Sequence, residues 1–347
     1  MTTLLLAVIY AAFISLGLPD ALLGSAWPMM YSEFEVSISR AGVVFMIISA
    51  GTVASSLMSD KLTRRFGTGK VTAFSVGVTA AALLGFSCST SFWMLCLWAV
   101  PYGLGAGSVD ASLNNYVALH YASRHMNWLH CMWGIGASVG PYIMGGILTM
   151  GLRWNMGYRT IGLLQIILTA VLFLSLPLWK KRIAEEDSQP FSTQLSLTQI
   201  IRIPGVRESM VVFFCYCALE QTAGLWASSY LVFCKGVSGE AAAVFASMFF
   251  TGIAVGRAVS GFLTIKLNDT QMIRLGQSVI ALGIGIMLLP FGQRFALAGF
   301  ILIGMGCAPI YPCIIHASSM PPPTDLVPNA PRLSLVCRWP ALILEHL

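Results

Sequence analysis

Charged residues are scarce in this chain: Asp, Glu, Lys and Arg make up 10% of its 347 residues, against about 25% in ordinary soluble domains. Hydrophobic residues make up 56%, and the mean hydropathy is +0.77. A globule of this composition has too few polar side chains to cover its surface, which excludes a water-soluble domain. The sequence therefore predicts an integral membrane protein surrounded by lipid.

Sequence motifs of enzymes and cofactor proteins are also missing. The chain has no Gly-rich phosphate loop, nucleophile elbow or paired-cysteine motif, and its nine Cys are scattered singly through apolar runs. His120, His125 and His130 recur at five-residue steps, which does not place them on one helical face. The net charge of +6 comes from basic residues in short loops. We therefore expect no cofactor, no metal site, no ATP and no nucleic-acid partner.

Long apolar runs dominate the chain, and none shows the period-two alternation of membrane barrel strands. A membrane-crossing helix needs about 20 mostly apolar residues. Ten runs meet this need: 4–27, 40–58, 71–89, 92–116, 128–150, 158–179, 209–232, 240–265, 272–290 and 295–316. Most Lys and Arg residues follow even-numbered runs, which predicts a cytoplasmic N-terminus by the positive-inside rule.

The chain divides into two unequal halves around a polar interval that contains the run KKRIAEED. We expect a six-helix half at residues 1–179, a cytoplasmic linker at 180–208, an incomplete four-helix half at 209–316 and an atypical Pro-rich tail at 317–347. An internal repeat at an offset of 201 residues supports two related halves. It pairs Gly51 with Gly252, Leu62 with Leu263, Thr63 with Thr264 and Arg65 with Lys266.

Asp20, Asp110 and Glu220 lie within apolar runs, where an acidic residue costs about 2.5 kcal/mol or more to insert. Asp20 shares a helical face with Gly17 and Gly24, next to the break that Pro19 makes. This pattern favours a carboxylate in a polar cavity. The alternative is that Asp20 lies near the outer end of its helix and reaches the lipid headgroups.

The other two acidic residues also have polar neighbours. Asp110 shares a Gly-lined face with Asn114, so the pair is a candidate site for hydroxyl groups or a proton; an interhelical bond made for packing is the alternative. Glu220 has no basic residue one turn away, which suits a group that gains and loses a proton. A fixed ion pair with Arg257, which also lies within a predicted helix, is the alternative for Glu220.

Three further residues complete the predicted binding site. His130 suits a proton relay or a hydroxyl contact, with a structural histidine as the alternative. Trp133 and Trp226 are candidate aromatic contacts for a substrate, although Trp residues in apolar helices more often serve packing.

These features resemble the major facilitator superfamily, and within it the fucose permease-like branch of sugar–proton symporters. The resemblance rests on the two halves, on DKLTRRFGTGK and GRAVSGFLTIKL after the second and eighth runs, and on GLPDALL and GAGSVDASLNNY. It implies a helical bundle of twelve helices, of which about ten are present here, so we expect a C-terminal truncation. It assigns Asp20 and Asp110 to substrate binding and proton coupling, and places Asn114 and His130 beside them.

The resemblance also implies a set of residues that control the conformational change: Asp60, Arg64, Arg65 and Arg257. Asp60 stands where the family has Gly, and Arg64 where it has Asp. We expect a monomeric transporter of the cell membrane that moves a polar small molecule, such as a sugar, with protons by alternating access. The alternatives are proton-driven efflux of apolar compounds, a membrane enzyme using His130 and Asp110, and a non-transporting sensor or a truncated chain without activity.

Overall fold

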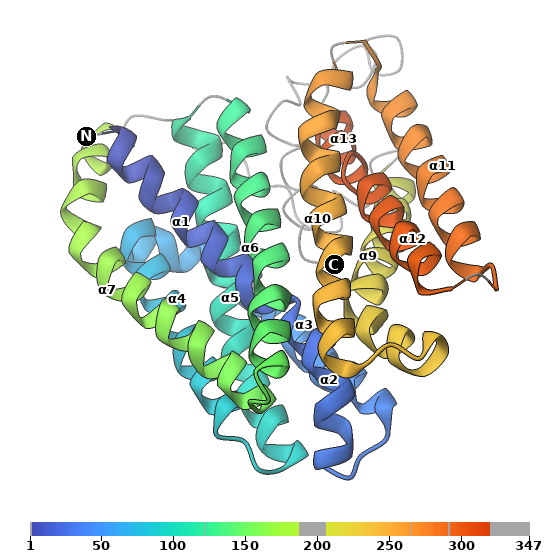
Figure 1. Cartoon of the computed structure of the whole chain (residues 1–347). Coiled ribbons are helices and arrows are strands. Elements are labelled where there is room, and N and C mark those ends of the chain that lie inside the picture. Colours follow the sequence, from blue (N-terminus) through green and yellow to red (C-terminus); the bar gives the residue numbers. More distant parts are fainter. Residues whose placement is uncertain (1, 122, 187–205, 265, 291, 320–347) are drawn as a thin grey trace.

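The computed structural model describes residues 2–121, 123–186, 206–264, 266–290 and 292–319, and within these ranges it contains helices and turns but no strand (Figure 1). The helices are α1 (Thr2–Asp20), α2 (Leu22–Glu33), η1 (Ile38–Arg40), α3 (Ala41–Phe66), α4 (Thr68–Ser87), α5 (Phe92–His120), α6 (Ser123–Thr149), α7 (Trp154–Glu186), α9 (Val206–Lys235), α10 (Gly239–Leu263), α11 (Asp269–Leu288), α12 (Gln293–Cys307) and α13 (Ile310–Ser319). The predicted all-helical fold is confirmed.

Ten helical stretches in this described part are long and apolar enough to cross a membrane, as predicted. Three of them combine helices: α1 with α2 as Leu4–Glu33, η1 with α3 as Ile38–Phe66, and α12 with most of α13 as Gln293–Ile314. Large apolar side chains stand exposed on their outer faces, among them Leu174 at 81% and Phe262 at 76%. Such surfaces are stable against lipid chains rather than water. The chain is thus a multi-pass membrane protein.

The first crossing is longer than predicted and is broken in the middle. It continues to Glu33 instead of ending at residue 27, and α1 gives way to α2 at Ala21. Pro19 accounts for the break, because proline lacks the N–H that a continuous helix requires. Asp20 therefore lies near the middle of the Leu4–Glu33 crossing, away from both ends.

Asp60, Arg64 and Arg65 were predicted to lie in a loop, and this prediction is wrong. All three lie in the last turns of α3, which ends at Phe66, and Gly67 alone separates α3 from α4. Gly67 has a φ of 84°, a backbone conformation that favours glycine and stops the helix. The Arg64 Nη2 pairs with the Asp60 Oδ2 at 3.0 Å, one turn apart on an exposed face, so the pair supports the helix instead of a loop.

The two halves pack their helices in the same way at positions 201 residues apart. In the first half, α5 crosses α3 where a side chain on Gly103 would collide with the Ile48 carbonyl oxygen. In the second half, α12 crosses α10 where a side chain on Gly304 would collide with the Phe249 carbonyl oxygen. Gly304 lies 201 positions after Gly103, and Phe249 lies 201 positions after Ile48, which is the offset of the sequence repeat.

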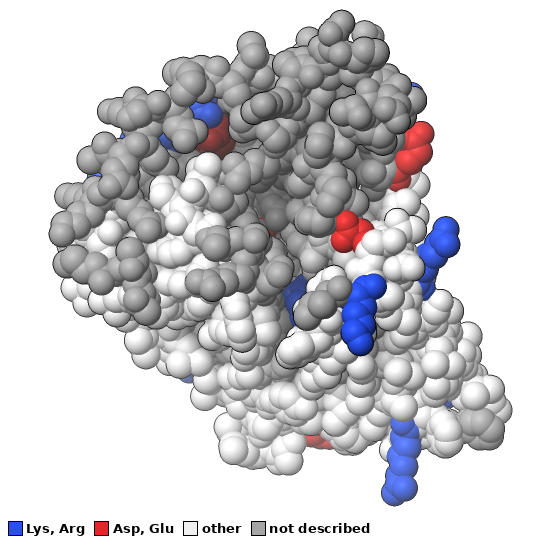
Figure 2. All heavy atoms as spheres, turned by 90° about the horizontal axis from the view of Figure 1, so that it is seen from above, with Lys and Arg blue, Asp and Glu red and all other residues white. Residues whose placement is uncertain are grey.

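The halves meet through α6 against α10 and through α2 against α9. Near the start of α2, a Cβ on Gly24 would come within 2.6 Å of the Gly224 carbonyl oxygen of α9. Further along the same two helices, the rings of Tyr31 and Phe233 meet at 5.7 Å. Helix backbones therefore touch across the two halves along this contact. Figure 2 shows the molecule from above, with basic and acidic side chains at the edge of this face.

The predicted linker and tail fall mostly outside the described residues. Of the interval 180–208, residues 180–186 continue α7 and 206–208 begin α9, whereas 187–205 are outside the description. Of the tail 317–347, residues 317–319 belong to α13, and the remainder is again outside it.

We expect Gly136→Ala to destabilise the fold, because a methyl group there would collide with the Ile14 carbonyl oxygen of α1. Overpacking of this kind costs about 1–3 kcal/mol, which lowers the melting temperature of the purified protein in detergent. Gly146→Ala in the same helix is the matched control, since its methyl group would meet no atom within 4 Å. Equal melting temperatures for the two variants would contradict the α1–α6 packing described here.

Candidate functional site

Asp20 accepts hydrogen bonds from two aromatic side chains. The Tyr102 hydroxyl of α5 donates to its Oδ1 at 3.1 Å, and the Trp133 Nε1 of α6 donates to its Oδ2 at 2.7 Å. Asp20 is an exposed residue although it lies mid-crossing, so its carboxyl is not sealed inside a core. Both oxygens are held while the group stays open to a small partner. The headgroup alternative for Asp20 does not fit this position.

Arg257 of α10 approaches the same indole from the other half. Its guanidinium carbon lies 5.2 Å from the centre of the Trp133 ring, a cation–π arrangement, and its Nη1 donates to the His130 carbonyl oxygen at 2.6 Å. Arg257 lies within α10, as its place in a predicted helix indicated, and its role in the conformational change stays a prediction. Trp133 therefore contacts Asp20 in its own half and Arg257 in the other.

Glu220 of α9 is a buried acidic group in the second half, and the positive charge of Arg257 stabilises its ionised carboxylate. The two side chains form no ion pair within 4.0 Å, so the fixed pair with Arg257 that was the alternative for Glu220 is absent between these described residues. The contacts that cross between the halves here are those of Trp133, with Asp20 on one side and Arg257 on the other.

Asp110 and Asn114 form a separate group on α5. The Asn114 Nδ2 donates to the Asp110 Oδ1 at 3.1 Å. Asp110 lies eight residues beyond Tyr102, which is about 12 Å along the helix axis. The structure therefore pairs Asp110 with Asn114 as the spacing predicted, but does not bring this pair to the Asp20 carboxyl.

The remaining predicted residues have mainly aromatic and apolar surroundings. The His130 ring lies edge-on to Phe13 at 6.0 Å and next to Tyr311 at 5.2 Å, so it joins the two halves by ring contact. Trp226 packs against the hydrophobic cluster around the fully buried Trp27. Among the described residues, no group of three His, Cys, Asp or Glu side chains is arranged to hold a metal ion.

Tyr102 and Gln165 are site residues that sequence reasoning missed. Tyr102 binds Asp20 directly, and Gln165 lies 2% exposed in α7 and bonds to the backbone of α1. Each carried a signal: Tyr102 follows a proline within an apolar helix, and Gln165 is an amide in the middle of TIGLLQIILTA. An uncharged polar side chain at membrane depth needs a partner, as a charged one does.

Comparison with known proteins identifies the family. The model of the Major Facilitator Superfamily matches residues 8–329. The chain belongs to the Major Facilitator Superfamily. The match confirms the predicted family. This superfamily consists of membrane transporters and not of enzymes, as expected.

Curated relatives within this superfamily are distant in sequence. The chain is 25% identical over 285 residues to "Bypass of stop codon protein 6" of Saccharomyces cerevisiae, covering 75% of this chain and 56% of the yeast protein. It is 20% identical over 322 residues to the glucose/mannose transporter GlcP of Bacillus subtilis, covering 90% of this chain and 79% of GlcP. The chain thus spans little more than half the length of the yeast relative.

Solved structures share the fold at low sequence identity. The crystal structure of a D-xylose–proton symporter superposes with a TM-score of 0.75 at 12% identity, over 99% of this chain and 87% of the symporter. A bacterial homologue of the human lysosomal transporter Spinster, in an inward-facing and unoccupied conformation, gives a TM-score of 0.70 at 14% identity, over 99% and 79%. These likenesses concern the fold alone.

We expect Trp133→Phe to lower the melting temperature in detergent, because phenylalanine keeps an aromatic ring for Arg257 but lacks the N–H that binds Asp20. Hydrogen bonds between membrane helices contribute about 1 kcal/mol. Trp128→Phe in the same helix is the control, since Trp128 is 55% exposed. If Trp133→Phe has the same melting temperature as Trp128→Phe and the wild type, the hydrogen bond to Asp20 contributes nothing to the stability of the fold.

Proposed function

We propose that this protein is a secondary active transporter that couples the uptake of a polar small molecule, such as a sugar, to protons by alternating access. The observation that carries the proposal is the Trp133 indole, which binds Asp20 in one half and lies against Arg257 in the other. The Asp20 carboxylate and the Arg257 guanidinium both contact the Trp133 side chain at the interface between the halves. A change in the charge of Asp20 in one half can therefore alter the contact that Arg257 makes from the other half.

The Asp20 carboxyl is the proton-carrying group of this mechanism. When it is ionised, it holds the Trp133 N–H and the Tyr102 O–H strongly, because hydrogen bonds to a charged acceptor are shorter and stronger than those to a neutral one. Protonation weakens this hold on Trp133 and removes a charge from the interface. The loaded and protonated protein then moves between its two states without an ionised carboxylate at Asp20.

Two buried polar atoms are available to hydroxyl groups of a substrate, one beside Trp133 and one on the separate Asp110–Asn114 group. The Arg257 Nε and the Asn114 Oδ1 have no hydrogen-bond partner within the described part of the chain. Buried polar atoms of this kind are costly unless a ligand or water satisfies them. Trp133 adds an aromatic face, and stacking on aromatic faces suits the apolar side of a sugar ring. The curated relative named as a glucose/mannose transporter agrees with this substrate class.

The proposal places the protein in the cell membrane as a single chain with a cytoplasmic N-terminus. Lys61, Arg65 and Lys70 lie around the junction of α3 and α4. Because the second crossing, Ile38–Phe66, returns across the membrane after the first, this junction lies on the side where α1 starts. A basic end of this kind faces the cytoplasm under the positive-inside rule.

Asp20→Asn is expected to abolish proton-driven uptake while leaving sugar exchange intact. The asparagine keeps the size of the side chain but cannot carry a proton. In proteoliposomes, accumulation driven by an inward proton gradient should fall about tenfold or more, whereas counterflow of preloaded sugar persists. Wild-type uptake should fall as the outside pH rises, because the carboxyl then loses its proton, and uptake by the variant should stay flat with pH.

Asp60→Asn is the matched control, because Asp60 is an exposed carboxylate paired with Arg64 at the end of α3. Asp110→Asn is expected to reduce uptake without flattening its pH dependence, since Asp110 is bound to Asn114 on the same helix. Normal proton-driven uptake by Asp20→Asn would disprove that Asp20 couples transport to protons. Uptake by Asp110→Asn that no longer changes with pH would assign that coupling to Asp110 instead.

A further inference from the structure

Pro19 leaves one backbone acceptor of α1 without its helical donor. In an α-helix, the N–H of each residue donates to the carbonyl four residues earlier, and proline has no N–H. The Ser15 carbonyl oxygen therefore receives no bond from residue 19. At membrane depth no bulk water replaces the missing donor, so such a group must find a partner elsewhere in the protein.

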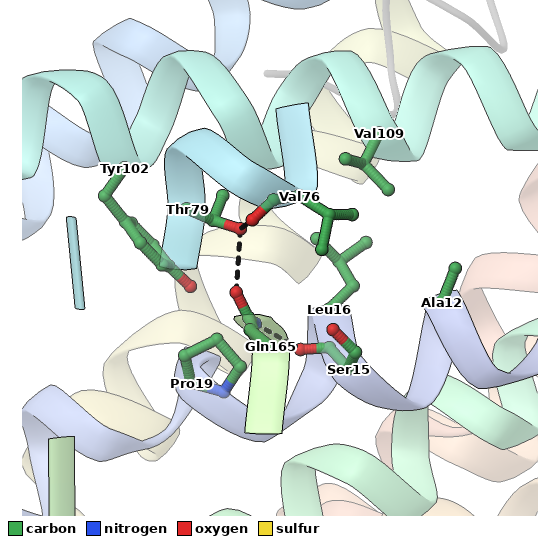
Figure 3. Close-up of a pocket in the computed structure, with 9 residues that line it drawn as sticks. All are labelled: Ala12, Ser15, Leu16, Pro19, Val76, Thr79, Tyr102, Val109 and Gln165. Carbon is green, nitrogen blue, oxygen red and sulfur yellow. Dashed lines mark hydrogen bonds between the residues drawn. The ribbon is translucent and has the colours of Figure 1, made fainter. Parts of the chain in front are cut away.

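Gln165 of α7 supplies that partner. Its Nε2 donates to the Ser15 carbonyl oxygen at 2.8 Å, and its Oε1 accepts from the Thr79 hydroxyl at 2.8 Å (Figure 3). The side chain is 2% exposed. Since the Ser15 carbonyl oxygen can only accept, its contact with Gln165 fixes which way the amide points.

A narrow pocket joins this amide to the candidate site. Gln165, Pro19 and Tyr102 all line it, together with Thr79 and Ser15 (Figure 3). Tyr102 then donates to Asp20, which is the residue after Pro19 and the last residue of α1. The geometry of the turn at Pro19 thus sets the direction in which the Asp20 carboxyl leaves the helix.

We propose that Gln165 is a positioning residue for Asp20. By replacing the hydrogen bond that Pro19 removes, it holds the broken turn of α1 in the one geometry that presents the carboxyl to both Tyr102 and Trp133. This inference rests on the proposed role of Asp20 as the proton-carrying group. Gln165 itself acts through the backbone of α1 and touches neither the proton nor the substrate.

A double-mutant cycle between Gln165→Leu and Pro19→Ala tests the proposal. Gln165→Leu leaves the Ser15 carbonyl unpaired, whereas Pro19→Ala restores an N–H that pairs with it within the helix. We expect Gln165→Leu to lower the melting temperature and to shift the pH at which uptake is half-maximal by about half a pH unit or more. Adding Pro19→Ala should recover most of the melting temperature but not the pH profile, because the closed turn directs Asp20 differently.

Thr169→Val is the control in the same helix, since the Thr169 hydroxyl bonds only the carbonyl of Gln165 one turn earlier. It should change neither the melting temperature nor the pH profile appreciably. An ordinary packing bond between α1 and α7 would give additive melting losses in the cycle and an unchanged pH profile in Gln165→Leu, and either result overturns the proposal.

The same cycle separates this proposal from the function on which it rests. If the wild-type protein shows no pH-driven uptake, the role of Asp20 is lost, and the positioning role of Gln165 with it. Non-additive melting in that case would still establish the backbone link between Gln165 and Pro19, because melting temperatures do not depend on transport.

Discussion

The two contacts of the Trp133 indole hold together the polar centre of this molecule. Its N–H is bound to the Asp20 carboxyl, and its ring faces the Arg257 guanidinium. Lipid offers no polar partner to a charge, so Asp20 and Arg257 at this depth need such contacts within the protein. Asp20 follows Pro19 at the break of the first crossing, and glycines let the helices that carry these groups approach closely.

Much of the fold was predictable because lipid imposes simple length and polarity rules. The number of crossings followed from apolar run length, and the repeat at an offset of 201 residues reappears in the packing of Gly103 and Gly304. The helix ends were less predictable. Charged residues such as Asp60 and Arg64 suggested a loop, but they pair along the helix, and only the backbone conformation of Gly67 ends it.

The candidate site was predictable in its residue types and less so in its partners. The acidic residues stood out because a charge within an apolar run is rare. Which of them meet could not be read from the sequence, since contacts between helices depend on their rotation and crossing. Tyr102 reaches Asp20 across 82 positions of chain, and Asp110, on the same helix as Tyr102, stays with its neighbour Asn114.

The glycine seam between α1 and α6 has a consequence for motion. Side chains on Gly17 or Gly136 would collide with the backbone of the opposite helix, so these helices lie too close to slide or separate freely. The bond from Trp133 to Asp20 lies within this closely packed pair of helices. Arg257 belongs to the other half. Under the proposed rocking of the halves, the indole would keep its acidic partner and exchange only its basic one.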